Sequence, residues 1–452
     1  MTMLWTASDL VRATGGTFRA RFDACGVSID TRSLRPGELF VALRGERGDG
    51  HDFVRDALTM GAAGAIVHRD AEAGPLLRVK DTLEGLQGLG AYGRNRFGGR
   101  LVAITGSVGK TTTKEMLRTI LSAQGAAHAA EASHNNHWGV PLTLARLPAD
   151  CRYCVIEIGM NHAGEIEPLA RLARPHVAVI TAIEPTHIGH LGSLDAIAEE
   201  KASILRGLEP DGIAVLPAES GFLPRLQAEA NRVVTFGTSE RADARLLSAD
   251  MHPSGSELAV RIADHHFRFW LHAPGQHMAL NAVAALAAAA ALGADPVAGA
   301  RALEQEFRPL AGRGAQRRIK LAGGEALLLD ESYNASSASV RAALSVLRLQ
   351  PANRRLAVLG DMLELGDEAP AEHAGLAQEL AETADQVFAC GPLMRHLIAA
   401  LPAGLPAQHT ADSAALAPIV ANAVRPGDAV LIKGSLGSRM RLIVSALETG
   451  GY

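Results

Sequence analysis

The sequence has little of three features that would define its class at once: cysteine, net charge and long apolar runs. Only four of its 452 residues are cysteine, too few for a disulfide scaffold, which predicts reduced thiols and a cytoplasmic protein. A formal net charge of -4 leaves no broad basic surface, so the composition argues against nucleic acid as a partner. Binding of small anions must therefore depend on local groups.

The apolar runs are also too short for a membrane protein. The longest, from about Met278 to Gly293, is mostly alanine, contains Asn281 and falls short of the ~20 residues that a membrane-spanning helix needs. It predicts a buried helix. Asp9 and Arg12 interrupt the first apolar stretch, so no signal peptide is predicted. We expect no membrane insertion.

The residues that are present fit a multidomain globular enzyme. Hydrophobic residues make up 48% and charged residues 20% of the chain, and domains usually contain roughly 100–200 residues, so about three are expected. Strand-like apolar runs alternate with helical stretches, for example at 101–104, 153–158 and 177–180. This alternation predicts the α/β class with mainly parallel sheets.

Two stretches rich in glycine and arginine, 93–100 and 308–315, interrupt this alternation. Such stretches are typical of connections. We therefore predict three domains, at 1–98, 99–310 and 311–452.

A phosphate-binding loop is predicted between an apolar strand and an amphipathic helix. Its residues are Thr105, Gly106, Ser107, Val108, Gly109, Lys110, Thr111 and Thr112. The glycines let backbone N–H groups surround phosphate oxygens, and the lysine supplies charge for the outer phosphates of ATP. Thr111 or Thr112 offers a hydroxyl to Mg²⁺. Because Ile104 stands where the common form of the loop has glycine, this is a shortened variant.

A carboxylate for the same metal is expected from a neighbouring strand. Glu157 lies in the apolar run 155–159, where a structural salt bridge is the alternative. His187 and Lys201 follow the next strand. Taken alone, such a histidine is more often a surface or packing residue, and such a lysine is usually on a solvated helix face. The pairs His187/His190 and His134/His137 lack a third ligand for zinc, and the pair Cys151/Cys154 lacks a second pair.

Taken in order, the phosphate loop, 135–142, 157–160, 164–166, His187 and Lys201 resemble the central domain of the Mur ligases, the ATP-dependent amide ligases of bacterial cell-wall synthesis. The stretches 39–53, 330–334, 358–366 and 433–435 resemble the branch that adds D-alanyl-D-alanine to UDP-N-acetylmuramoyl-tripeptide. The resemblance covers the whole chain. It implies a small α/β N-terminal domain, a central P-loop ATPase-like domain and a C-terminal Rossmann-like domain.

The resemblance also implies roles for individual residues. The UDP-sugar-peptide would be held by Ser28, Asp30, Thr31, Arg32, Arg44, Gly45, Asp49, His51, Asn135 and Asn136. Beyond the phosphate loop, ATP would meet Asn281, Arg313, Asp330 and Asn334. Two Mg²⁺ ions would be held by Thr111, Glu157, His187 and Lys201 as a carbamate. The catalytic residues would be Lys110, His187, Lys201 and Arg313.

Some positions depart from the family pattern. Glu331 stands where a second Asp is usual, Ser336-Ser337 where Asn-Pro is usual, and 216–219 lacks the Asn-x-Asp often seen there. The third residue of the tripeptide, diaminopimelate or lysine, stays open. A monomer is expected. The alternatives are a P-loop switch or motor and, among ligases, folylpolyglutamate synthase, cyanophycin synthetase and the diaminopimelate-adding ligase.

Overall fold

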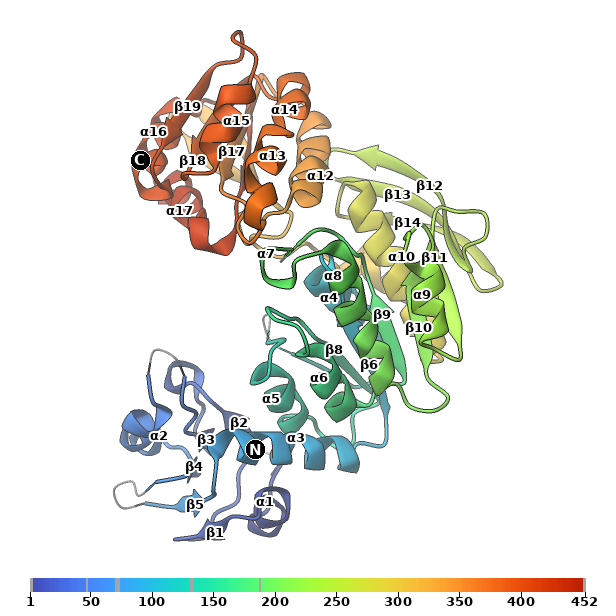
Figure 1. The fold of residues 1–452 in the computed structure, drawn as a ribbon, viewed down its shortest axis with the longest axis vertical. Coiled ribbons are helices and arrows are strands. Elements are labelled where there is room, and N and C mark those ends of the chain that lie inside the picture. The colour runs from blue at the N-terminus through green and yellow to red at the C-terminus, as the bar shows by residue number, and fades with distance from the viewer. Residues whose placement is uncertain (1–2, 46–47, 70–73, 131–133, 187, 450–452) are drawn as a thin grey trace.

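The computed structural model describes residues 3–45, 48–69, 74–130, 134–186 and 188–449. Three sheets follow one another along the chain and form three successive units, drawn from blue through green and yellow to red (Figure 1). The predicted α/β class with mainly parallel sheets is confirmed.

The N-terminal unit contains a five-stranded sheet of order β1-β5-β4-β3-β2, in which only β1 is antiparallel to its neighbour. Its strands are β1 (Thr17–Phe18), β2 (Gly26–Ser28), β3 (Glu38–Val41), β4 (Gly64–Val67) and β5 (Leu76–Arg78). Its helices are α1 (Ala7–Thr14), η1 (Thr31–Ser33), η2 (Gly50–Phe53), α2 (Val54–Thr59) and α3 (Thr82–Arg96).

The central unit contains a nine-stranded sheet of order β14-β13-β12-β11-β10-β9-β6-β8-β7. Its strands are β6 (Arg100–Thr105), β7 (Ala127–Ala129), β8 (Tyr153–Glu157), β9 (Val177–Ile180), β10 (Ile213–Pro217), β11 (Val233–Gly237), β12 (Ala244–His252), β13 (Gly255–Ile262) and β14 (His265–Leu271). Its helices are α4 (Lys110–Ser122), α5 (Gly139–Ala145), α6 (Ile166–Ala173), α7 (Ile188–Leu191), α8 (Leu194–Ala202), η3 (Ser203–Gly207), α9 (Leu223–Ala228), α10 (Gln276–Ala291) and α11 (Pro296–Glu306). The strands β6 to β12 pair in parallel, whereas β12, β13 and β14 form an antiparallel extension that the sequence did not predict.

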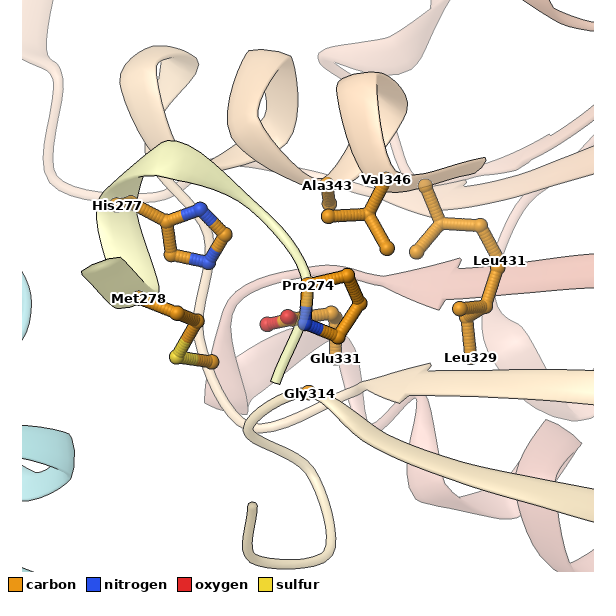
Figure 2. A pocket seen from close by; sticks show the side chains of 9 residues that line it. All are labelled: Pro274, His277, Met278, Gly314, Leu329, Glu331, Ala343, Val346 and Leu431. Atoms are coloured by element: carbon orange, nitrogen blue, oxygen red, sulfur yellow. The ribbon is translucent and has the colours of Figure 1, made fainter. Parts of the chain in front are cut away.

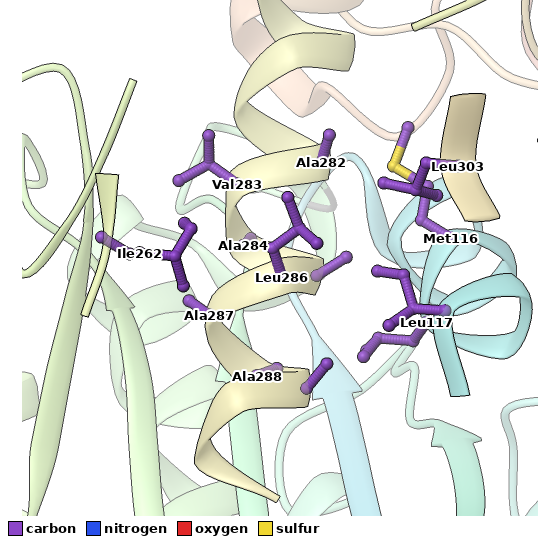
Figure 3. Packing of buried hydrophobic residues seen from close by; sticks show 14 of the residues in the cluster. Met116, Leu117, Ile262, Ala282, Val283, Ala284, Leu286, Ala287, Ala288 and Leu303 are labelled. Atoms are coloured by element: carbon purple, nitrogen blue, oxygen red, sulfur yellow. The ribbon is translucent and has the colours of Figure 1, made fainter. Parts of the chain in front are cut away.

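The alanine-rich helix α10 fills the core on one face of this sheet. Figure 3 shows it between Ile262 of β13 on one side and Leu117 of α4 and Leu303 of α11 on the other. Methyl side chains such as Ala284 and Ala288 allow close packing on both sides, so the buried helix predicted from the sequence is confirmed. None of the helices that the structure describes is long and apolar enough to cross a membrane.

The C-terminal unit contains a six-stranded sheet of order β15-β16-β20-β17-β18-β19, parallel except for β15. Its strands are β15 (Ala315–Leu321), β16 (Gly324–Glu331), β17 (Arg354–Gly360), β18 (Gln386–Cys390), β19 (Ala407–Thr410) and β20 (Asp428–Lys433). Its helices are α12 (Ser337–Arg348), η4 (Gly366–Glu368), α13 (Ala369–Ala374), α14 (Ala377–Thr383), α15 (Met394–Ala400), α16 (Ser413–Ala423), η5 (Leu436–Ser438) and α17 (Arg441–Thr449). Helices α12 to α15 cover one face, and α16 and α17 cover the other.

The predicted divisions at 98/99 and 310/311 fall in the connections between the sheets, and they stay a prediction as domain boundaries. The first connection is not a simple linker. Leu142 and Ala145 of α5 complete the core of the N-terminal unit, and the indole nitrogen of Trp5 donates a hydrogen bond of 2.9 Å to the Ala145 carbonyl. Gly93 of α3 passes so close to α5 that a Cβ there would lie 2.2 Å from the Leu144 carbonyl oxygen. Helix α5 of the central unit therefore contributes to the hydrophobic core of the N-terminal unit.

Candidate nucleotide-binding and ligation site

The phosphate loop connects β6 to α4, and two glycines determine its shape. Gly106 has φ 149° and Gly109 has φ 82°, conformations that other residues rarely adopt. A Cβ at position 106 would lie 1.9 Å from the Thr181 hydroxyl, and one at 109 would lie 2.5 Å from the side-chain oxygen of Asn281. The predicted nucleotide residue Asn281, in the second turn of α10, thus lies directly against the loop.

Side chains and backbone following β9 hold this loop. The Thr181 hydroxyl donates to the Val108 carbonyl at 2.5 Å. The Ser107 hydroxyl donates to the Glu184 carbonyl at 2.8 Å and accepts from the Glu184 backbone N–H at 2.9 Å. These three bonds fix the loop against the segment that follows β9.

Lys110 begins α4 and lies across its own loop. Its ammonium donates to the Gly106 carbonyl at 2.6 Å and to the Ser107 carbonyl at 3.4 Å. Burial lowers the pKa of Lys110, and the charge of Arg313 lowers it further, while Glu157 opposes both effects. An anion in the loop would favour the ammonium form, because opposite charge stabilises a buried cation.

Glu157 ends β8 with only 1% of its surface exposed. One carboxylate oxygen accepts the Thr111 hydroxyl at 2.8 Å, and the other accepts the Asn135 amide at 2.8 Å. These bonds to a charged acceptor offset the cost of its burial. In the described part of the chain it forms no ion pair with Lys or Arg, so the salt bridge considered from the sequence is not formed. Its oxygens and the Thr111 hydroxyl are the kind of ligand that Mg²⁺ prefers.

Lys201 lies on α8 and is 2% exposed. Burial lowers its pKa well below the usual value, the nearby charge of Lys110 acts in the same direction, and Glu200 opposes them. The Glu200 carboxylate itself accepts backbone N–H groups of Gly164 and Ile166 at 2.7 and 2.8 Å, which anchors α8 to the start of α6. His187 lies outside the described residues. No group of three or more His, Cys, Asp or Glu side chains suited to a metal occurs among the residues described.

The hinge between the central and C-terminal units carries Arg313. Its guanidinium lies 3.8 Å from the ring centroid of Tyr333, and its charge contributes to the lowered pKa of Lys110. Gly312 and Gly314 on either side have φ 78° and 97°, which allows the chain to turn there. The structure thus places the predicted hinge arginine on the phosphate-loop side.

The other two C-terminal candidates make contacts within their own unit. The buried carboxylate of Asp330 accepts from Arg317 at 2.8 Å and from the Ser332 hydroxyl at 2.6 Å. The side chain of Asn334 accepts from the Ala335 N–H, and its carbonyl accepts from Lys433 at 3.0 Å. Their contact with ATP stays a prediction.

A small pocket beside the hinge contains residues that the sequence analysis did not single out. Figure 2 shows Pro274, His277 and Met278 of the central unit facing Glu331 and Leu329 of the C-terminal unit. Burial lowers the pKa of His277, and the Glu331 carboxylate pairs with Lys433 at 3.4 Å. In the sequence, the one sign of this pocket was Glu331, which departs from the family pattern.

The N-terminal unit contains an open cavity of about 540 Å³. Its lining residues are Arg44, Gly45, Gly48, Asp49, His68 and Arg69. Three of these were predicted, whereas His68 and Arg69 follow β4 and carry no motif. His51 is buried behind the cavity: its Nδ1 lies 2.6 Å from Asp49, and its Nε2 accepts from the His68 N–H at 3.1 Å. Burial lowers the pKa of His51. The histidine is therefore neutral when its ring positions the Asp49 carboxylate.

The remaining sugar-nucleotide candidates lie at strand and helix ends. Ser28 is buried at the end of β2, and its hydroxyl donates to the Asp30 carbonyl at 3.0 Å. Thr31 begins η1, and Arg32 forms an ion pair of 2.6 Å with Asp30, whose pKa it lowers. The Asn136 side chain accepts two backbone N–H groups at the start of α5.

The chain segment 135–138 connects these candidates with the phosphate-loop region. A Cβ on Gly45 would lie 3.0 Å from the Trp138 ring, and Asn135, three residues earlier, binds Glu157. The N-terminal cavity and the central site are thus linked by a short stretch of chain.

Fold and site together define a three-unit P-loop protein whose phosphate loop lies near the hinge arginine Arg313 and whose N-terminal unit carries a polar cavity. Models of three protein domains match the chain in order: "Mur ligase family, catalytic domain" at 24–83, "Mur ligase middle domain" at 104–289 and "Mur ligase, glutamate ligase domain" at 317–436. The chain belongs to the Mur ligase family, as the motifs of the sequence predicted.

Curated relatives resemble it over nearly their whole length. It is 36% identical to the UDP-N-acetylmuramoyl-tripeptide--D-alanyl-D-alanine ligase of Escherichia coli (strain K12), with 94% of each chain covered. It is 33% identical to the ligase of the same name from Bacillus subtilis (strain 168), with 93% of each chain covered.

Solved structures show the same three-unit fold. MurF from Acinetobacter baumannii superimposes with a TM-score of 0.87 at 33% identity over 98% of each chain. MurF from Thermotoga maritima in complex with ADP gives a TM-score of 0.80 at 26% identity, covering 94% of this chain and 97% of that one.

Proposed function

We propose that this protein is an ATP-dependent ligase that joins D-alanyl-D-alanine to UDP-N-acetylmuramoyl-tripeptide and so forms the pentapeptide precursor of peptidoglycan. The observation that carries the proposal is the similarity to ligases of this name across all three units, together with an intact phosphate loop at the centre. The similarity to a structure that holds ADP supports ATP as the nucleotide.

The chemistry requires activation of a carboxylate, which does not react with an amine at neutral pH. The γ-phosphoryl group of ATP passes to the terminal carboxylate of the tripeptide, giving an acyl phosphate and ADP. The dipeptide amine then attacks the acyl carbon, phosphate leaves, and the nitrogen loses a proton to give the amide. Lys110 and Arg313 would spread the negative charge of the transferring group, which is a task of positioning and electrostatics.

Two Mg²⁺ ions are part of the proposal. Thr111 and Glu157 offer a hydroxyl and a carboxylate beside the loop, and His187 and Lys201 would complete the set. Bound Mg²⁺ would neutralise phosphate charge. The lowered pKa of Lys201 favours the free amine, which adds to CO₂ with loss of a proton to give a carbamate, an oxygen ligand in place of a cation.

The N-terminal cavity would hold the UDP-sugar end of the substrate, with the cationic side chains of Arg44 and Arg69 facing anionic oxygens. The C-terminal unit would supply the dipeptide and close over the site. We propose a cytoplasmic monomer. The four cysteines, all free, fit a reducing compartment.

Replacement of Lys110 by alanine tests the function. Phosphate release with the tripeptide nucleotide, D-alanyl-D-alanine and ATP should fall at least about 100-fold, because the loop loses its point charge. Lys320→Ala, which removes an exposed lysine on β15, is the matched control and should leave the rate unchanged.

Several outcomes would contradict the proposal. Near-normal turnover by Lys110→Ala would do so. A wild-type protein that prefers UDP-MurNAc-dipeptide with diaminopimelate or lysine would be a different ligase. Phosphate release without any amino-acid substrate would instead favour a P-loop switch.

A further inference from the structure

Two candidate metal ligands of the central unit lie on different elements: Glu157 ends β8, and Lys201 lies in the last turn of α8. Glu157 accepts a hydrogen bond from Thr111 beside the phosphate loop. The charge of Lys110 acts on Lys201, so that lysine also lies near the loop. Among the residues that the structure describes, no hydrogen bond or ion pair joins the two side chains directly. Their separation must therefore be set by the elements that carry them.

Glu200, the neighbour of Lys201, ties α8 to the segment that follows β8. Glu200 is 7% exposed, and its two carboxylate oxygens accept the backbone N–H groups of Gly164 at 2.7 Å and Ile166 at 2.8 Å. Ile166 is the first residue of α6, and the side chain of the preceding Glu165 forms no cap there. Helices α6 and α8 pack on the same face of the central sheet (Figure 1). Glu200 thus caps α6 from another helix, where the positive end of the helix dipole favours a carboxylate.

Hydrogen bonds also stiffen the segment between β8 and α6, which leads from Glu157 to this cap. The Gly159 N–H donates to the Asn135 carbonyl at 2.8 Å, and the Asn135 amide in turn holds Glu157. Farther along, the Glu165 carboxylate accepts two backbone N–H groups of the same segment, at 2.7 and 3.2 Å. The end of β8 and helix α8 are therefore connected through Glu200 by a series of hydrogen bonds.

Glu199, the residue before Glu200, has a different environment. Its side chain is 42% exposed and pairs with Arg206 and Arg225 at the surface. Exposed ion pairs of this kind contribute little, whereas loss of an acceptor that leaves a buried N–H without a partner costs more. The bond from the Ile166 N–H to Glu200 is buried. Glu200 therefore contributes more than Glu199 to the position of α8 against the start of α6.

We propose that Glu200 is a positioning residue for the ligation, which sets Lys201 against Glu157 so that both serve the same pair of Mg²⁺ ions beside the phosphate loop. This inference rests on the proposed function and assigns a role to a side chain that contacts backbone N–H groups rather than substrate. If Glu200 served only as a cap for α6, its loss would lower stability and leave the metal site unchanged. The two roles therefore differ in what a substitution does to metal binding.

Replacement of Glu200 by glutamine tests this role. The carboxamide has nearly the same size, but its oxygen can accept only one of the two N–H groups, and its NH₂ group faces the other. The affinity of the ADP-bound protein for Mn²⁺, measured by EPR of the free ion, should fall about tenfold to 100-fold, as for other groups that orient metal ligands. kcat should fall by a similar factor. KM for D-alanyl-D-alanine and the affinity for UDP should stay as in the wild type.

The matched control is Glu199→Gln, the same chemical change one residue earlier on the same helix. It removes surface ion pairs and should leave the Mn²⁺ affinity and kcat unchanged. Glu200→Asp keeps the charge but has a shorter side chain, so it cannot hold both N–H groups where they are, and it should resemble Glu200→Gln. An aspartate variant equal to the wild type would show that charge alone acts, and would overturn the positioning role.

Melting temperatures of all the variants separate folding from positioning. A Glu200→Gln protein that binds Mn²⁺ and turns over like the control, whatever its melting temperature, would identify a helix cap only and overturn the proposal. Failure of both variants at position 200 to fold would do the same, since the residue would then belong to the fold. Failure of the wild type to ligate the dipeptide would instead refute the proposed function. The Mn²⁺ measurement needs no acceptor, so the two failures are distinguishable.

Discussion

The conformation of the phosphate loop depends on close contacts between single atoms. Gly109, the N-cap residue just before α4, has φ 82°, and the side-chain oxygen of Asn281 occupies the space where a Cβ would be. The same contact that excludes a side chain at position 109 holds Asn281 against the site, so the glycine and the asparagine depend on each other.

Gly109→Ala should therefore weaken nucleotide binding. The added methyl group must displace Asn281 and strain the backbone, and we expect the affinity for ADP to fall at least about tenfold. Isothermal titration calorimetry measures the effect. Gly221→Ala, at a position with no atom within 4 Å of the new methyl group, should bind ADP as the wild type does. Equal affinities for all three proteins would show that the loop tolerates the change.

The sequence alone could predict the site residues that belong to a local motif. The loop from Thr105 to Thr112 and the hinge arginine Arg313 carry local signals of glycine and charge. Glu157 was predicted from its place at the end of an apolar strand and Asn281 from the family resemblance, and the structure brings both to the loop. His68 and His277 were missed because their partners are distant in sequence and no local pattern marks such pairs.

At the scale of elements, helix α13 anchors the strand-to-helix connection after β17. His373 on this helix is fully buried, with Nδ1 2.6 Å from the Ala369 carbonyl and Nε2 accepting from the Met362 N–H at 3.0 Å. Both bonds are satisfied only by the neutral ring with its proton on Nδ1. Burial lowers the pKa of His373 accordingly.

This anchor should make stability depend on pH. The unfolded chain takes up a proton on His373 near pH 6.5, whereas the folded protein takes it up only at lower pH. The contribution of His373 to the free energy of unfolding is thus complete above about pH 6.5 and declines as the pH falls towards the lowered folded-state pKa.

His373→Gln removes the titration and should flatten this part of the pH dependence. Urea midpoints at pH 7.5 and 5.5 provide the measurement, and the loss on acidification should be smaller in the variant than in the wild type. Identical losses would mean that the ring is protonated without cost to the fold.

Elements were predictable where their apolar period is regular. The parallel strands β6, β8 and β9 and the alanine-rich helix α10 were predicted from continuous apolar runs. The antiparallel strands β12 to β14 were not, because their pattern mixes buried and exposed positions with charged residues. Their pairing is set by contacts with β11 and α10.

At the scale of the whole molecule, the three units lie one after another, and the C-terminal unit meets the central one at the hinge and at α7 (Figure 1). The reaction needs water excluded from an acyl phosphate, which a movement at the 308–315 hinge would provide. Small-angle X-ray scattering should show a smaller radius of gyration with an ATP analogue and the nucleotide sugar. Lys110→Ala, with its weakened phosphate loop, is the control and should change less. Superimposable profiles of the free and loaded wild type would count against closure.

The shared core at α5 has a consequence for how the protein is made. The N-terminal unit is synthesised first, but Leu142 and Ala145, which complete its core, follow roughly fifty residues after position 98. At translation rates of ~5–20 residues per second this separation is a delay of about 3–10 s. During this interval Trp5 has no carbonyl partner and the apolar side of α3 is uncovered. The nascent chain thus exposes an apolar surface while it is still attached to the ribosome. A chaperone that binds nascent chains would bind the side of α3 that α5 later covers.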